Sequence, residues 1–178
     1  MFNDISDVPW AKEAIENLAN RGIIAGFGDG SFAPHSNVTR EQFVKMFLQS
    51  FKIPTTSGNM FLDVDNSAWY APFVYGALNT GIVTGVSQTE FGTGMSITRQ
   101  DLVAIIYRMM VKLDTFPDKV TDVSFKDMAE IDDYALEYVS TLLSYGVVNG
   151  MDDGSFAPKQ LVTRAMAAQI AFNLLSII

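Results

Sequence analysis

The chain has 178 residues, of which 48% are hydrophobic and 18% are charged, and its formal net charge is −8. This composition favours a packed core over disorder, and the acidic balance argues against partners such as nucleic acid or anionic membranes, which need basic surfaces. The absence of cysteine excludes disulfides, Cys-ligated zinc and a cysteine nucleophile. The longest apolar stretches, 102–106 and 165–178, are short or contain polar residues, so no membrane insertion is expected.

Five short markers recur three times along the chain in the same order. They are a Phe-x-Asp segment at Phe2, Phe61 and Phe125, an aromatic residue at Trp10, Trp69 and Tyr134, a glycine before two aliphatic residues at Gly22, Gly81 and Gly146, a second glycine at Gly26, Gly85 and Gly150, and a Thr-Arg pair beginning at Thr39, Thr98 and Thr163. We therefore divide the chain into three repeats, 1–58, 59–119 and 120–178. Units of this size bury little surface alone, which favours one compact unit with a shared core.

The first half of each copy predicts a helix. In copy one, Asp7 is a candidate N-cap, and Pro9 lies near the helix start, where proline is tolerated. Trp10, Ala14, Ile15 and Leu18 are expected on one apolar face. Gly22 then predicts the C-terminal end of the helix, and Gly81 and Gly146 do so in the later copies.

A loop and a second helix follow in each copy. The loops of copies one and three contain Asp-Gly-Ser-Phe-Ala-Pro, in which Asp-Gly favours a tight turn, whereas copy two reads Val-Ser-Gln-Thr-Glu-Phe-Gly over 86–92. Each Thr-Arg threonine is a candidate N-cap of the second helix, whose wide apolar stripe suggests packing among several neighbours. The simplest arrangement is mainly α, with three helix–loop–helix repeats and their second helices together in pseudo-threefold symmetry. Segments 52–59 and 114–122 are the predicted connectors.

The arginine after each threonine opens a helix, at Arg40, Arg99 and Arg164. A cation at a helix N-terminus is unfavourable by roughly 0.3–1 kcal/mol unless an anion lies nearby. One explanation is an inter-repeat ion pair with an acid such as Asp4, Asp63 or Asp127. The other is a bound anion that contacts the guanidinium and the free amides of the helix start. The residues alone leave both explanations open.

The recurrent aromatics and second glycines also have two explanations. Trp10, Trp69 and Tyr134 can pack in the core or stack on a sugar ring at the rim of a groove. Gly26, Gly85 and Gly150 can serve as turn residues or allow a ligand close to the backbone. No enzyme motif accompanies them: His35 is the only histidine and is expected in an exposed loop, and no metal-binding pattern occurs. We therefore expect neither an enzyme nor a cofactor or metal.

In order, these markers resemble the S-layer homology (SLH) repeat over essentially the whole chain, and the complete string occurs in copies one and three. The resemblance implies a pseudo-threefold prism around a central three-helix bundle, with ligand grooves between repeats. It also implies a non-catalytic, extracellular module that anchors S-layer proteins or surface enzymes of Gram-positive bacteria to the cell wall. The implied ligand is a secondary cell-wall polysaccharide bearing ketal pyruvate, and other S-layer subunits are partners through the parent protein.

The SLH helix-opening motif is typically Thr-Arg-Ala-Glu, and the resemblance assigns its arginine, a ligand of the pyruvate carboxylate, to Arg40, Arg99 and Arg164. Here the motifs read Thr-Arg-Glu-Gln, Thr-Arg-Gln-Asp and Thr-Arg-Ala-Met, so the final glutamate is absent from all three. We therefore expect unequal grooves, with the one that uses 86–92 the most altered. Replacing the arginines by alanine is expected to weaken cell-wall binding and to leave the fold intact. The alternative function is a structural self-assembly module whose arginines form internal ion pairs.

Overall fold

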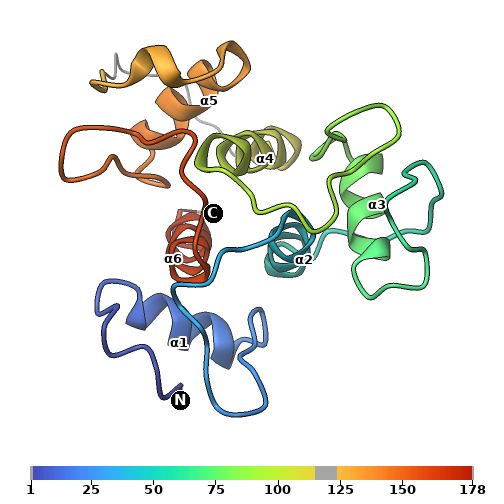
Figure 1. Ribbon diagram of the computed structural model, residues 1–178, viewed down its shortest axis with the longest axis horizontal. Helices are drawn as coiled ribbons and strands as arrows, with labels where there is room; N and C mark the ends of the chain where they lie inside the picture. The colour runs from blue at the N-terminus through green and yellow to red at the C-terminus, as the bar shows by residue number, and fades with distance from the viewer. Residues whose placement is uncertain (1, 115–123, 178) are drawn as a thin grey trace.

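The computed structural model describes residues 2–114 and 124–177, and within these ranges the regular structure is helical (Figure 1). The helices are α1 (Lys12–Asn20), α2 (Arg40–Ser50), α3 (Ala71–Asn79), α4 (Arg99–Lys112), α5 (Asp133–Ser144) and α6 (Arg164–Leu175), with a 3₁₀ turn η1 (Met128–Glu130) before α5. The mainly helical class is therefore confirmed. The predicted connector 114–122 lies almost wholly outside the described residues.

The first helix of each copy ends as the glycine pattern predicts. After α1, Gly22 has a φ of 69°, its N–H donates to the carbonyl of Ala19, and the next N–H, of Ile23, donates to the carbonyl of Leu18. This pair of hydrogen bonds is a Schellman motif, which places a residue of left-handed conformation just beyond the helix. Gly81 and Gly146, with φ of 74° and 67°, end α3 and α5 in the same way.

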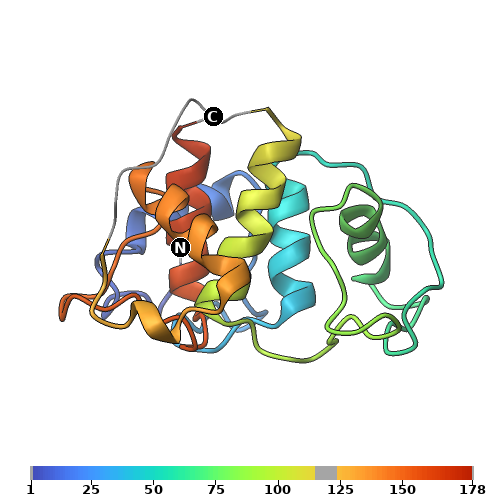
Figure 2. The same cartoon turned by 90° about the horizontal axis from the view of Figure 1, so that it is seen from above.

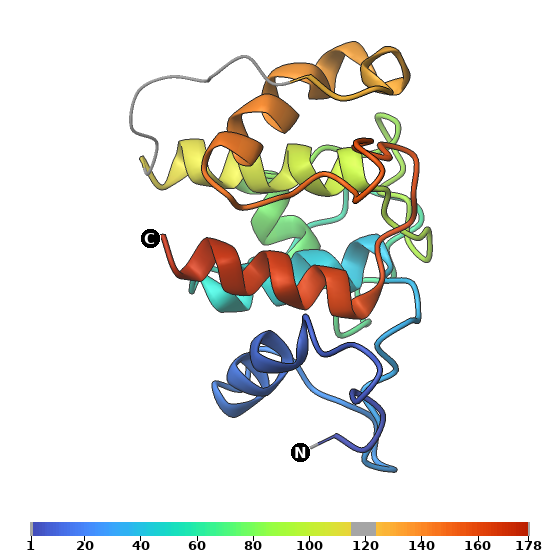
Figure 3. The same cartoon turned by 90° about the vertical axis from the view of Figure 1, so that its left-hand side faces the viewer.

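Helices pack across copies, each first helix against a second helix of another copy. In Figure 1, α2, α4 and α6 occupy the middle and α1, α3 and α5 lie outside them. Outer α3 contacts α2, α5 contacts α4, and α1 contacts α6, which joins the beginning of the chain to its end. Figure 3 shows α1 beneath α6 from the side. One buried apolar cluster runs through all three copies.

The N-terminal ends of α2, α4 and α6 gather at one end of the molecule (Figure 2). The residues just before the three helices form a closed ring of backbone hydrogen bonds, all between buried residues. The N–H of Val38 donates to the carbonyl of Val162 at 2.9 Å, that of Val162 to Ile97 at 2.9 Å, and that of Ile97 to Val38 at 3.0 Å. This cyclic pattern is approximately threefold and fixes the three arginine-bearing helix starts relative to one another.

The beginning of α1 differs from the prediction. The helix starts at Lys12 with Ala11 as its N-cap, and no side chain caps it. Asp7 does not cap the helix because its carboxylate meets His35 instead, with 2.7 Å between Oδ2 and Nε2. Trp10 therefore precedes the helix and is 54% exposed, whereas Ala14, Ile15 and Leu18 form the buried face as predicted. None of the described helices is both long and apolar enough to cross a lipid bilayer.

Candidate functional site

The three helix-opening arginines make the same contacts. Each guanidinium donates through Nε to the carbonyl of a loop phenylalanine and through Nη2 to the carbonyl of the residue before the second marker glycine, always in another copy. The acceptors are Phe91 and Thr84 for Arg40 (3.1 and 3.2 Å), Phe156 and Asn149 for Arg99 (2.8 and 2.8 Å), and Phe32 and Ala25 for Arg164 (2.7 and 2.8 Å). Each cation also lies over the ring of the same phenylalanine, 4.5–5.1 Å from its centroid.

Ion pairs with Asp4, Asp63 or Asp127, one of the two explanations that the residues left open, do not form among the described residues. The aspartates hold the loops instead. Asp127, for example, accepts the backbone N–H groups of Phe156 and Ala157, both at 2.8 Å. The Asp127 carboxylate therefore binds N–H groups of this loop segment, and the Arg99 guanidinium binds the carbonyl of Phe156 in the same segment. Asp4 and Asp63 hold the loops of copies one and two in the same way.

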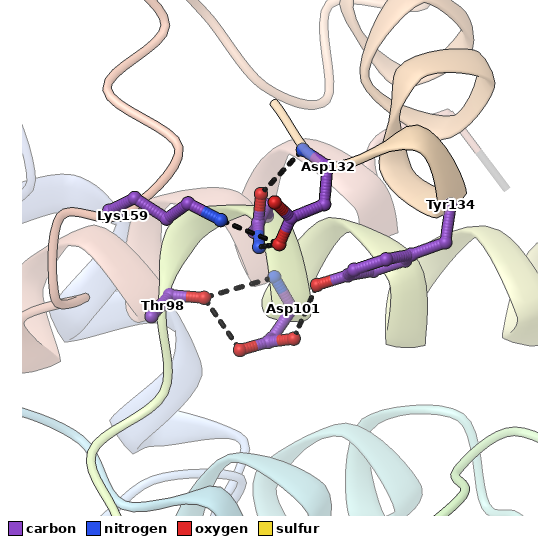
Figure 4. A network of polar contacts seen from close by, with 6 residues as sticks. Thr98, Asp101, Asp132, Tyr134 and Lys159 are labelled. Atoms are coloured by element: carbon purple, nitrogen blue, oxygen red, sulfur yellow. Dashed lines mark hydrogen bonds and ion pairs between the residues drawn. The ribbon is translucent and has the colours of Figure 1, made fainter. Parts of the chain in front are cut away.

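The first amide of each second helix is not free either. The first helical N–H of each second helix donates to a carbonyl in another copy, from Arg40 to Met95, from Arg99 to Gln160 and from Arg164 to Ser36, each at 2.9 Å. The threonine N-caps form as predicted at α4 and α6, where the hydroxyls of Thr98 and Thr163 accept the N–H three residues on, as Figure 4 shows for Thr98. At α2, Gln42 accepts the N–H of Thr39, but the Thr39 hydroxyl has no hydrogen-bond partner among the described residues. The next amides of α4 and α6, of Gln100 and Ala165, also donate to carbonyls of another copy, so a bound anion at these two helices would meet the guanidinium alone.

Arg40 and Arg99 are buried, at 8% and 6% exposure, and Arg164 is half-buried. Burial lowers the pKa of all three guanidinium groups, because the charged form loses hydration. Nη1 has no hydrogen-bond partner among the described residues in any of the three. Because Nε and Nη2 use one edge of the guanidinium, its other edge, formed by Nη1 and the second N–H of Nη2, is left to bind an anion end-on.

A groove lies beside each arginine, and each groove combines residues from all three copies. We name the grooves by their arginines. The Arg99 groove, of about 1060 Å³, adds the loop around Gly150 and Trp10. The Arg164 groove, of about 200 Å³, adds the loop residues Ala25 and Phe27, and Trp69. The Arg40 groove, of about 230 Å³, adds Gly85 and Tyr134.

The three recurrent aromatics lie at these grooves and not in the core. Trp10 is 54% exposed, Trp69 53% and Tyr134 42%. Lys45 of α2 lies over the Trp69 ring, with its Nζ 4.9 Å from the centroid, and this contact fixes the ring at the edge of the Arg164 groove. Half-exposed aromatic faces beside a hydrogen-bonding cation are a suitable surface for a sugar ring.

The glycines at 26, 85 and 150 have a packing role. None has a positive φ, but a Cβ at any of them would overlap the ring of the Phe-x-Asp phenylalanine of the same copy, namely Phe2, Phe61 or Phe125. At Gly26 and Gly85 it would also overlap a loop carbonyl. Gly85 and Gly150 line grooves, whereas Gly26 lies between two lining residues. The described structure thus gives these glycines a reason that needs no ligand.

A further residue lines each groove, the last residue of the Thr-Arg motif, where the SLH repeat typically has glutamate. This residue is Gln42 in the Arg164 groove, Asp101 in the Arg40 groove and Met166 in the Arg99 groove. The motif alone does not show which groove each of these residues faces, because this depends on packing across copies. His35 and Asp7 also line the Arg99 groove, whereas the sequence predicted only that His35 would be exposed.

The chain is thus a helical module of three copies with three grooves, each assembled from a buried or half-buried arginine, a glycine-containing loop and a half-exposed aromatic of different copies. Comparison with known protein families matches residues 2–44, 61–103 and 124–168 to the S-layer homology domain, and the chain belongs to that family. It is 37% identical over 176 residues to "Exoglucanase XynX" of Acetivibrio thermocellus and 38% identical over 177 residues to "Amylopullulanase" of Thermoanaerobacterium thermosulfurigenes. Each alignment covers 98% of this chain, but 16% and 9% of those proteins.

The "Surface-layer 125 kDa protein" of Lysinibacillus sphaericus is 29% identical over 153 residues, which cover 85% of this chain and 12% of that protein. The chain therefore spans less than a fifth of the length of these relatives. Membership of the SLH family identifies the chain as a cell-wall anchoring module and places it at the cell surface.

Proposed function

We propose that this module anchors its parent protein non-catalytically by binding a pyruvylated secondary cell-wall polysaccharide in the grooves between its copies. The arginines would meet the pyruvate carboxylate, and Trp10, Trp69 and Tyr134 would contact the sugar rings. The observation that carries the proposal is the state of the arginines. They are buried or half-buried cations whose contacts within the described residues are neutral carbonyls and aromatic rings.

A buried cation is unfavourable unless an anion or a full set of hydrogen bonds compensates it. Two carbonyls satisfy one edge of each guanidinium and hold it in place, and the other edge has no partner among the described residues. A ketal carboxylate would complete it with charge-assisted hydrogen bonds of about 1.5–3 kcal/mol each. The net negative charge of the chain opposes association with an anionic polymer. Local binding at the arginines would overcome this opposition.

The proposal is tested by calorimetric titration with purified wall polysaccharide, before and after removal of its pyruvate. The wild-type module should bind the pyruvylated polymer, and loss of the ketal should weaken binding at least tenfold. The double variant Arg99→Ala/Arg164→Ala should lose binding to a similar degree. Arg21→Ala is the matched control, because Arg21 is an exposed arginine that lines none of the three grooves. Equal binding with and without pyruvate would contradict the proposal.

The alternative of a self-assembly module loses the ion pairs on which it depended, since the arginines contact carbonyls. It predicts that the polysaccharide does not bind in either form and that the module associates with itself. Sedimentation measurements on the same samples distinguish the two functions.

A further inference from the structure

The peptide unit between Asn149 and Gly150 has a reactive sequence and lies at the Arg99 groove. These two residues form the only Asn-Gly pair of the chain, and the residue at the place of Asn149 is Ala25 in copy one and Thr84 in copy two. Both are exposed, lie outside the helices and line the groove. An asparagine followed by glycine is prone to deamidation, because glycine has no Cβ to hinder attack of its nitrogen on the asparagine side chain.

The groups that react are not held by other contacts. Neither the N–H of Gly150 nor the side-chain amide of Asn149 has a hydrogen-bond partner among the described residues. The carbonyl of the same peptide unit accepts Nη2 of Arg99 at 2.8 Å. A positive charge at this oxygen stabilises the anion that forms when the peptide nitrogen loses its proton. The contact with Arg99 therefore favours the nucleophilic form of the Gly150 nitrogen.

Deamidation of this pair needs only water as a co-reactant. The deprotonated Gly150 nitrogen forms a bond to Cγ of Asn149, the bond from Cγ to the side-chain nitrogen breaks, and that nitrogen leaves as ammonia. The resulting succinimide ring joins the Gly150 nitrogen to both carbonyl carbons of residue 149. Water opens the ring at Cγ to give aspartate, or at the main-chain carbon to give isoaspartate. In isoaspartate the chain runs through Cγ, and the former main-chain carbonyl group is a free carboxylate.

We propose that Asn149 is a modification site and that its conversion to isoaspartate gives Arg99 a carboxylate partner within the chain. The oxygen that Arg99 binds is the main-chain oxygen of residue 149, which becomes a carboxylate oxygen in isoaspartate. An anion thus replaces a neutral acceptor at the same guanidinium. Aspartate at this position carries its charge on the side chain and leaves the bonded carbonyl neutral. The other two arginines bind the carbonyls of Thr84 and Ala25, which cannot react in this way.

The modification has a consequence for binding, which rests on the proposed function, whereas the modification itself does not. A chain carboxylate at Arg99 would neutralise the charge that attracts the carboxylate of an acidic saccharide. We expect isoaspartate at position 149 to weaken saccharide binding in the Arg99 groove on the order of tenfold, which corresponds to one charge-assisted hydrogen bond. Deamidation would therefore reduce the affinity of one groove and leave the other two unchanged.

The modification is tested by incubating the purified module at mildly alkaline pH and mapping its peptides by mass spectrometry and chromatography. Asn66 is the internal comparison, because it is also exposed and precedes a small residue, but the Ser67 N–H is bonded to Asp65 at 2.9 Å. Because that bond must break first, Asn149 should convert on the order of tenfold faster than Asn66, with isoaspartate as the main product. Conversion no faster than that of Asn66, or to aspartate alone, would overturn the proposal.

The pairing with Arg99 is tested without a ligand by NMR of the arginine side chains. Asn149→Ala is the matched control, because copy one has Ala25 at this place and its carbonyl accepts from Arg164 at 2.8 Å, so the contact does not need asparagine. After the same incubation, the guanidinium signals of Arg99 should shift in the wild type and stay unchanged in Asn149→Ala. Those of Arg164 should stay unchanged in both. Unchanged Arg99 signals in converted wild-type protein would overturn the pairing.

Calorimetric titration with pyruvylated wall saccharide separates this inference from the proposed function. One site of the converted wild type should bind on the order of tenfold more weakly, whereas Asn149→Asp and incubated Asn149→Ala should bind like fresh wild type. If fresh and converted wild type bind equally well, the effect on the Arg99 groove is refuted and the proposed function stands. If fresh wild type does not bind, the proposed function fails, and the peptide map and the NMR signals still decide the modification. A thermal melt shows that each sample is folded.

Discussion

Replacing Arg99 by alanine should destabilise the fold as well as weaken binding, contrary to the expectation from the sequence that such a change leaves the fold intact. The change removes two charge-assisted hydrogen bonds of 2.8 Å, to the carbonyls of Phe156 and Asn149, and the cation–π contact with the Phe156 ring. At about 1.5–3 kcal/mol each, the two bonds amount to about 3–6 kcal/mol. Two effects offset part of this loss. The variant no longer buries a cation that lacks a carboxylate partner, and water can reach the carbonyl of the exposed Asn149. We therefore expect the free energy of unfolding to fall by about 2 kcal/mol.

For a domain of this length, such a loss lowers the melting temperature by about 4–8 °C. Urea unfolding followed by circular dichroism should show a lower midpoint with an unchanged slope, because the folded state stays as compact as before. Arg40→Ala should be affected less, since its two bonds are longer, at 3.1 and 3.2 Å. Exposed Arg21→Ala should stay within about 0.5 kcal/mol of the wild type. If Arg99→Ala were as stable as Arg21→Ala, the arginine would not hold the loop and this reasoning would be refuted.

Two further predictions concern stability. Burial acts to raise the pKa of Asp63, but hydrogen bonds from three backbone N–H groups outweigh it and hold the pKa below its ordinary value. The resulting stabilisation is present above about pH 4 and is lost as the pH falls through the folded-state pKa. In urea unfolding, Asp63→Asn should therefore be less stable than the wild type at pH 7 and nearly equal to it in acid. Gly26→Ala should cost about 2 kcal/mol or more in thermal unfolding, because its Cβ would overlap the Phe2 ring, whereas Gly28→Ala, with nothing within 4 Å, should be nearly neutral. Equal melting temperatures of the two glycine variants would contradict this packing role.

Local signals predicted the helices well. The threonine N-caps and the glycines that end the first helices act over one or two turns, so the residues themselves determine the outcome. Asp7 misled the prediction because a side chain from the loop of the same copy, His35, competes for its carboxylate. Such competition depends on how the loop folds back, and neither periodicity nor spacing reveals it.

Which copies combine to form each groove was harder to predict than which residues line the grooves. The arginines, aromatics and two of the three second glycines do line the grooves, but the sequence does not show which copy supplies which part. Arg99 of copy two, the loop around Gly150 of copy three and Trp10 of copy one meet in a single groove. The sequence was also silent on the acceptors of the guanidinium groups, because backbone carbonyls have no signature in the residue types.

This assembly explains how three copies of one repeat can produce unequal grooves. Because every groove takes its arginine, its loop and its aromatic from different copies, substitutions at several positions of one copy change a different component of each groove. Copy two places Asp101 in the Arg40 groove, Arg99 in the largest of the three grooves and Trp69 in the Arg164 groove. Divergence of one copy therefore need not disable one site completely. It can tune the three grooves separately while the hydrogen-bond ring at Val38, Ile97 and Val162 keeps them in one fixed frame.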